Sequence, residues 1–149
     1  LIAGDGPLRK TMEVMARELG IEKHVRFLGI RRDIPQLMNA ADAYVMSSAW
    51  EGMPMVLLEA SATGLPIVAT DVGGNREVVL HNKTGFLVPP KDSDALAHAM
   101  LLLMHLPRAL RNQMGQRARE HVLAHFDLER VVDSWEELYQ RLLRVYHVV

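Results

Sequence analysis

The sequence of 149 residues predicts an α/β fold in which helices cover both faces of a parallel β-sheet. Short apolar segments that suit strands alternate along the chain with segments whose apolar residues recur at helical spacing. The turns between them are short, as is usual where parallel strands are connected through helices. From Ser93 onward only the helical pattern continues. We therefore expect a Rossmann-like sheet followed by a set of C-terminal helices.

Apolar segments bounded by glycine, proline or polar residues mark the expected strands. They are residues 1–3, 25–28, 43–46, 67–70 and 86–88. Gly4 and Gly29 directly follow the first two of these segments, and Ser47 follows the third. Because ligands of open parallel sheets bind beyond the carboxyl ends of the strands, these exits are candidate ligand-binding loops.

Apolar residues three and four apart, together with capping residues, mark the expected helices. They are residues 8–19, 34–40, 54–63 and 76–80, a segment that begins at 93, and residues 110–124 and 128–146. Asp33 is expected to cap the second helix and Asp127 the last one, because a carboxylate at the N-cap accepts from free helix amides. Gly20 and Gly64 are expected to end the first and third helices.

Composition excludes some classes of protein. The 17 Lys and Arg residues nearly balance the 18 Asp and Glu residues, and the formal net charge of -1 gives no general attraction to nucleic acid. No cysteine is present, which excludes disulfide bonds and agrees with a cytoplasmic location. The longest apolar run, residues 99–104, is too short to cross a bilayer. We therefore expect a soluble, cytoplasmic protein that binds no nucleic acid.

The segment from Ser47 to Gly64 has the features of a ligand site. It leaves the third expected strand, turns at Gly52 and enters a helix at Pro54, a residue suited to the first helical turn. The segment also carries two glutamates, Glu51 in the turn and Glu59 in the helix. Carboxylates accept hydrogen bonds from hydroxyls, and helix N-termini attract phosphates. A nucleotide sugar has both kinds of group, so it is the ligand that this segment predicts.

Seven segments of the chain together form a recognisable pattern. They are GDGP at residues 4–7, VRFLG at 25–29, ADA at 41–43, Ser48 with EG at 51–52 through EA at 59–60, GLPIVAT at 64–70, GG at 73–74 and TGFLVP at 84–89. In these segments and their order the chain resembles the nucleotide-binding, C-terminal half of GT-B fold glycosyltransferases, particularly the retaining enzymes of family 4. The pair Glu51 and Glu59 is the most specific part of the resemblance, which extends from residue 1 to about 126.

The resemblance implies roles for individual residues. Glu59 would accept hydrogen bonds from the ribose of the donor, and Glu51, as the catalytic residue, would face the hydroxyls of the transferred sugar. The other donor-binding residues that it implies are Gly4, Gly29, Ile30, Arg31, Gly52, Met53, Pro54 and Met55. Pro54 has no N–H, so it would contribute shape without a hydrogen bond. Neither a metal ligand nor a cofactor is implied, because the nucleotide diphosphate sugar is itself the donor substrate.

The resemblance also implies a reaction and a domain organisation. The reaction is hexosyl transfer to an acceptor hydroxyl with retention, as in the synthesis of envelope or exopolysaccharide glycans. Residues 1–126 would form the donor-binding domain, and residues 127–149 a helix that packs on it. An N-terminal domain for a glycan or lipid-linked acceptor, and a first strand followed by diphosphate-binding Arg and Lys, would precede Leu1. Without them we expect this chain alone to be inactive, and the whole protein to be cytoplasmic, with a peripheral position at the inner face of the membrane.

Other interpretations of the same residues remain open. A non-catalytic nucleotide-sugar sensor or assembly module, or a sugar-nucleotide epimerase with a GT-B fold, would use the same domain. Paired carboxylates also occur in glycosidases, but phosphate-binding loops at a parallel sheet edge argue against that class. His121 and His125 have a spacing able to bind metal, although a plain helix surface explains them better.

The strand implied upstream of Leu1 has a structural consequence. In the family it lies between the strands that match residues 1–3 and 43–46, so its absence leaves two strand edges unpaired. Because open edges invite association, we expect either direct pairing of those two strands or a homo-oligomer in which a second chain completes the sheet.

Overall fold

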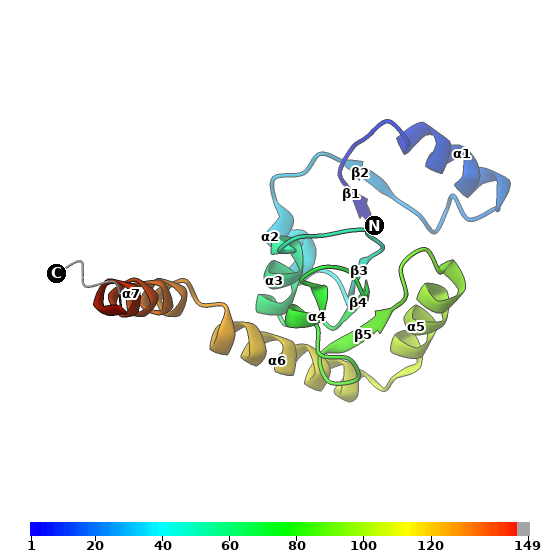
Figure 1. The fold of residues 1–149 in the computed structure, drawn as a ribbon. Helices are drawn as coiled ribbons and strands as arrows, with labels where there is room; N and C mark the ends of the chain where they lie inside the picture. Colours follow the sequence, from blue (N-terminus) through cyan, green and yellow to red (C-terminus); the bar gives the residue numbers. More distant parts are fainter. Residues whose placement is uncertain (146–149) are drawn as a thin grey trace. The chain divides into compact units, whose positions relative to one another are not determined.

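The computed structural model describes residues 1–145 of the chain, which fold into two compact units (Figure 1). The first unit comprises residues 1–37, and the second begins at Met38. Both contain parallel strands connected through helices, which confirms the predicted α/β class.

The first unit is a βαβ unit. Strand β1 (Ile2–Ala3) leads to helix α1 (Arg9–Glu18) and then to strand β2 (Phe27–Gly29), which pairs with β1 in parallel. Gly20 has a φ of 68°, a left-handed conformation that ends α1 as its position in the sequence predicts. Helix α2 (Ile34–Asn39) starts in this unit and ends in the second.

The second unit contains a three-stranded parallel sheet in the order β3-β4-β5. Its strands are β3 (Tyr44–Met46), β4 (Ile67–Thr70) and β5 (Gly85–Val88). All four residues of the central strand β4 are buried, because strands pair with it on both sides and helices cover its faces. Val68 of β4 and Val88 of β5 form a core cluster with Ala99, Leu103 and Met114 from two of the helices.

Five helices belong entirely to the second unit. They are α3 (Met55–Ala62), α4 (Asn75–Val78), α5 (Ser93–His105), α6 (Arg108–His125) and α7 (Leu128–Val145). Figure 1 shows α3 and α5 on opposite sides of the sheet, so the expectation of helices on both faces is confirmed. The helix expected over residues 54–63 begins one residue later, with Pro54 as its N-cap. Among these helices and those of the first unit, none is long and apolar enough to span a membrane.

Helices α3 and α6 pack closely because a glycine lies at their crossing. A Cβ added to Gly115 of α6 would lie 1.9 Å from the carbonyl oxygen of Gly64, the residue that ends the turn after α3. Gly64 itself has a φ of 82°, which side chains rarely adopt. Arg119 of α6 donates a hydrogen bond to the carbonyl oxygen of Ala62, the last residue of α3. These contacts with α6 hold in place α3, the helix that carries Glu59.

One expectation about local structure is wrong. The side chain of Asp33 was expected to cap α2. Its carboxylate instead forms an ion pair with Arg31, whose Nε donates to Oδ1 at 2.8 Å. Strand β1 pairs with β2 within the first unit and β3 with β4 within the second, so the expected pairing of residues 1–3 with 43–46, which would join the two units, stays a prediction. The two-residue strand β1 obtains its hydrogen bonds from β2, and completion of the sheet by a second chain stays a prediction.

The C-terminal helix begins where the sequence predicts, and the structure describes it as far as Val145. Helix α7 begins at Leu128 as predicted, and the expected last residue, Tyr146, lies outside the described residues. No residue of α7 is buried. The expected packing of residues 127–149 on the donor-binding domain stays a prediction.

We predict that Gly115→Ala destabilises the protein by about 1–3 kcal/mol, because the new methyl group would overlap the Gly64 carbonyl. The melting temperature of the purified variant, compared with that of the unsubstituted protein, measures the effect. Gln113→Ala, on the exposed side of α6, is the matched control and should change stability by less than about 0.5 kcal/mol. A stabilising Gly115→Ala, as at an exposed helical glycine, would contradict this account of the crossing.

Candidate functional site

The candidate site lies where β3 and β4 end, at the carboxyl edge of the sheet in the second unit. The loop after β3, residues 47–54, leads into α3, and the loop after β4, residues 71–74, leads into α4. Neighbouring parallel strands deliver both loops to the same edge. The sequence placed Glu51, Gly52 and Met53 on the first of these loops, and the structure confirms that placement.

The two loops contact each other through their backbones. The amide of Gly74 donates to the carbonyl oxygen of Gly52 at 3.0 Å. A Cβ on Gly73 would lie 1.7 Å from the carbonyl oxygen of Glu51, and a Cβ on Gly74 would lie 2.6 Å from that of Gly52. Gly73 also has a left-handed φ of 47°. Only glycine fits at these two positions, so the pair of glycines sets how closely the loop with Glu51 approaches the second loop.

Glu51 is held by a short hydrogen bond. Its Oε1 accepts from the hydroxyl of Ser48 at 2.7 Å, a distance typical of a bond to a charged acceptor. The Glu51 side chain is half-buried, and no other protein donor to it is found among the described residues. One carboxylate oxygen is therefore engaged by the protein, and the other can accept from a ligand.

The two glutamates act on the same side chain. Burial raises the pKa of the Tyr44 phenol on β3, and the negative charges of Glu59 and Glu51 raise it further. Both carboxylates thus lie near this phenol, although one comes from a loop and the other from the middle of α3. Sequence reasoning paired Glu51 with Glu59 and missed Tyr44. The signal that could have found it is a tyrosine in an otherwise apolar strand that runs into the candidate loop.

The start of α3 offers backbone donors. Pro54, the N-cap, is fully buried and provides no side-chain cap. Within the described part of the chain, the amides of Gly52 and Met53 donate to no protein acceptor. The Met55 amide donates to the Met53 carbonyl oxygen at 3.0 Å, so in this conformation it is engaged. Two of the three backbone donors expected from the sequence are therefore free to bind an anionic or hydroxylated ligand.

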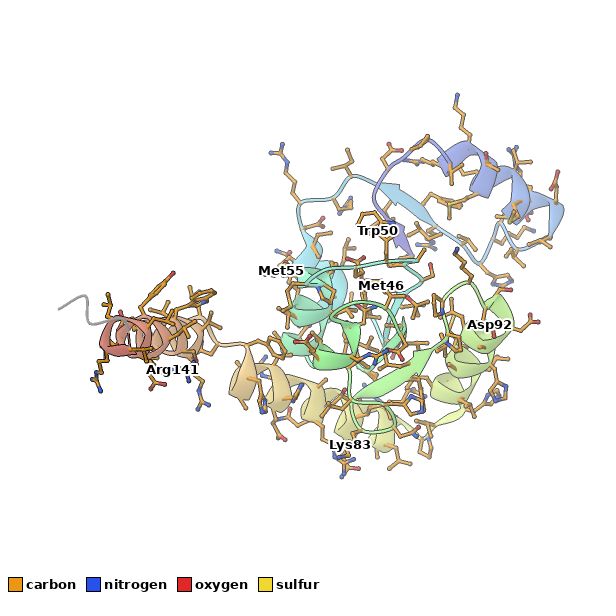
Figure 2. All side chains as sticks on the ribbon, viewed as in Figure 1. Met46, Trp50, Met55, Lys83, Asp92 and Arg141 are labelled. Carbon is orange, nitrogen blue, oxygen red and sulfur yellow. The ribbon has the colours of Figure 1, made fainter. Side chains whose placement is uncertain are left out.

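Large apolar side chains of this segment point outward. Trp50 is 83% exposed, and Met53 and Met55 are 50% and 61% exposed. Figure 2 labels Trp50, which lies in the loop before α3, and Met55, the first residue of α3. The loop is thus fixed by its backbone and presents its side chains to the surroundings.

Four predicted donor-binding residues belong to the first unit. Gly4 and Gly29 both have left-handed φ values, and the Gly4 amide donates to the Gly29 carbonyl oxygen at 2.8 Å. Ile30 is 79% exposed. Arg31 pairs with Asp33, and its hydrogen bond lowers the pKa of that carboxyl. These residues form the exits of β1 and β2, where the sequence placed them.

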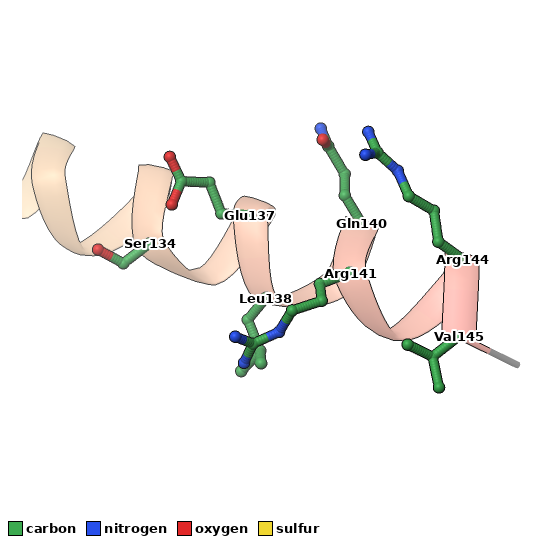
Figure 3. Close-up of a pocket in the computed structure, with 7 residues that line it drawn as sticks. All are labelled: Ser134, Glu137, Leu138, Gln140, Arg141, Arg144 and Val145. Carbon is green, nitrogen blue, oxygen red and sulfur yellow. The ribbon is translucent and has the colours of Figure 1, made fainter.

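The remaining candidates have structural partners. Arg76 of α4 is a cation near this edge of the sheet, but it donates to the Asp71 carboxylate at 3.1 Å through two nitrogens. His121 and His125 contact backbone oxygens of Glu77 and His121, at 2.8 and 2.9 Å. In residues 1–145 no group of three or more potential ligands is arranged to hold a metal ion. A depression of about 520 Å³ lies along α7 (Figure 3), but residues of that helix alone line it, so it is an open helix surface.

The sequence matches the family described as glycosyl transferases group 1 over residues 1–121. It is 38% identical, over 97% of its length, to N-acetyl-alpha-D-glucosaminyl L-malate synthase of Bacillus anthracis, of which it covers 38%. It is 32% identical, over 93% of its length, to UDP-Gal:alpha-D-GlcNAc-diphosphoundecaprenol alpha-1,3-galactosyltransferase of Escherichia coli, of which it covers 36%.

The fold is similar to that of a solved protein with a bound nucleotide sugar. The structure of HepE from Anabaena in complex with UDP-glucose matches 93% of this chain with a TM-score of 0.83 and 31% sequence identity, and the match covers 40% of that protein. The chain thus spans well under half of the length of the proteins that it matches.

We predict that Gly73→Ala loosens the loop with Glu51, because the added methyl group would overlap the Glu51 carbonyl and force a left-handed φ on alanine. The expected result is a lower melting temperature and faster hydrogen exchange at the Gly74 amide, which donates to the Gly52 carbonyl oxygen. Gly52→Ala is the matched control on the same segment, since a Cβ there would meet open space. Equal exchange rates in both variants would refute the glycine contact.

Proposed function

The chain belongs to the glycosyl transferases group 1 family, and we propose that it forms the donor-binding domain of a glycosyltransferase that uses a nucleotide diphosphate sugar. The observation that carries the proposal is the position of Glu51 in the loop before α3 and Glu59 within α3, beside free backbone amides at the carboxyl edge of a parallel sheet. Carboxylates suit the hydroxyls of such a donor, and amides suit its diphosphate. The similar protein HepE, which was solved with UDP-glucose, supports this class of ligand.

Each carboxylate has its own part of the donor to bind. Glu59 lies in the middle of α3 and is exposed, so its ionised carboxylate can accept from both hydroxyls of a ribose. Glu51 lies in the turn before α3, with one oxygen bonded to Ser48 and the other available for the transferred sugar. Loss of the Glu59 charge should therefore weaken nucleotide binding, whereas loss of the Glu51 charge should slow transfer.

The reaction breaks the bond between the anomeric carbon and the diphosphate and forms a bond to an acceptor hydroxyl, with retention. Negative charge develops on the leaving diphosphate, and the amides of Gly52 and Met53 are oriented donors that can stabilise it. The Met55 amide can contribute only if it leaves the Met53 carbonyl. Further cations, implied by the family resemblance, would come from residues upstream of Leu1.

The remaining parts of the function follow from the family and are proposed with it. The acceptor, a glycan or a lipid-linked sugar, binds an N-terminal domain outside this chain, and the diphosphoundecaprenol acceptor named for the Escherichia coli relative supports the lipid-linked class. Such a protein would act in the cytoplasm or at the inner face of the membrane, in envelope or exopolysaccharide synthesis.

In the full-length protein, we predict that Glu59→Gln raises the Kd for the nucleoside diphosphate about tenfold or more, because hydrogen bonds to a charged acceptor are the stronger kind. Glu51→Gln should leave this Kd unchanged and lower kcat. Calorimetric titration with UDP, GDP and ADP measures the first effect, and transfer assays with their sugars measure the second. Glu137→Gln on the exposed face of α7 is the control and should change neither quantity.

The same assays separate the alternative functions. Donor binding without transfer by the full-length protein would indicate a non-catalytic module, and conversion of the sugar nucleotide without any acceptor would indicate an epimerase. The proposal fails if the unsubstituted protein binds none of the nucleotides, or if Glu51→Gln and Glu59→Gln leave binding and transfer unchanged.

We also predict that chelation of divalent cations leaves the transfer rate unchanged, because the proposed site stabilises the diphosphate with backbone amides and with the cationic side chains that the family resemblance implies. The rate with excess EDTA, compared with the rate in added Mg²⁺ or Mn²⁺, checks this. A rate that falls on chelation and returns with one of the metals would contradict the proposed metal-independent reaction.

A further inference from the structure

A chain of side-chain hydrogen bonds runs from α4 to Glu51. Its last link is the 2.7 Å bond from the Ser48 hydroxyl to Glu51 Oε1. Before it, the hydroxyl of Thr70 donates to the Ser48 carbonyl oxygen at 2.6 Å. First in the chain, the side-chain amide of Asn75 donates to the Thr70 carbonyl oxygen at 2.8 Å. Each member thus fixes the residue that holds the next one.

In this series of hydrogen bonds, the residues far from Glu51 are buried, and those next to it are partly exposed. Asn75, the first residue of α4, is fully buried, and Thr70, the last residue of β4, is 3% exposed. Ser48 and Glu51 are half-buried. The chain therefore begins in the rigid core and ends at the carboxylate that can meet a ligand. A buried hydroxyl or amide has few alternative partners, so its bonds hold one geometry.

The hydrogen bond to Glu51 selects one orientation of its carboxylate. A glutamate side chain has several rotatable bonds, and ordering it during catalysis would cost free energy at each turnover. The bond from the Ser48 hydroxyl to Oε1 restricts that freedom before the substrate binds. Thr70 in turn sets where the Ser48 backbone lies. Catalytic groups held in a productive geometry before the substrate binds lower the barrier of the chemical step.

We propose that Ser48, Thr70 and Asn75 are positioning residues that orient the Glu51 carboxylate toward the transferred sugar of the donor. The proposal rests on the function proposed above. None of the three residues contacts the substrate in this scheme, and they act through Glu51 alone. They should therefore affect the transfer step and leave the nucleotide part of the donor, which Glu59 binds, untouched.

The Thr70 hydroxyl gives the sharpest test, because two substitutions separate the hydrogen bond from the shape of the side chain. Thr70→Val keeps the shape and removes the donor, whereas Thr70→Ser keeps the donor. In the full-length protein we expect Thr70→Val and Ser48→Ala to lower kcat about tenfold, the effect of one orienting hydrogen bond, with the Kd for UDP, GDP or ADP unchanged. Thr70→Ser should restore kcat to near that of the unsubstituted protein.

Thr84→Val is the matched control. Thr84 is 1% exposed, and its hydroxyl accepts from the Leu80 amide at 2.8 Å, so its loss also removes a buried hydrogen bond in this unit. This variant should lose stability in the same way as Thr70→Val but keep its kcat. The donors assayed are UDP-glucose, UDP-galactose, UDP-N-acetylglucosamine and GDP-mannose, and the one that the unsubstituted protein turns over is used throughout.

A second measurement needs no ligand. Hydrogen exchange at the Gly74 amide, which donates to the Gly52 carbonyl oxygen, should be faster in Thr70→Val than in Thr70→Ser or Thr84→Val. The inference is overturned if this exchange is equal in the three variants, or if Thr70→Val and Thr84→Val lower kcat alike. A failure of the proposed function appears separately, as absence of nucleotide binding and transfer in the unsubstituted protein.

Discussion

The contact between two glycines and the backbone of Glu51 and Gly52 is the constraint on which the site depends. Gly73 and Gly74 let the loop after β4 lie against the loop after β3, with no room for a side chain between them. Because β4 is buried at the centre of its sheet, the second loop starts from a fixed point. The backbone contacts of the second loop in turn fix the position of Glu51. The hydrogen bond from Thr70 to the Ser48 carbonyl oxygen also holds the loop that carries Glu51.

The order and type of the elements could be predicted because each local signal agreed with the tertiary structure. Strand β4 matches the prediction at both ends, since an apolar run stands between a proline and a polar turn. Boundaries shifted elsewhere by one or two residues, where fewer signals mark them. The cap expected from Asp33 was wrong because Arg31, two residues away, offers that carboxylate a bidentate partner. A propensity cannot reveal such competition between neighbouring side chains.

The candidate site could be predicted in part, since the positions of the loop residues follow from strand order alone. The hydrogen bonds that hold these loop residues do not follow from strand order. The Thr70 hydroxyl reaches the Ser48 carbonyl oxygen because of the register between β3 and β4, in which Met46 lies opposite Ala69. Register and rotamers depend on packing across the whole unit, so the sequence pattern could indicate which loops meet without indicating which side chains do.

The exposed side chains at the start of α3 take no part in anchoring the loop that precedes this helix. The loop is anchored through backbone atoms and buried Pro54, while Trp50, Met53 and Met55 extend outward. Replacing such side chains leaves the anchoring contacts intact. Under the proposed function, the fold could therefore keep one frame for the donor while the exposed side chains beside it change by single substitutions, a low-cost route from one glycan product to another.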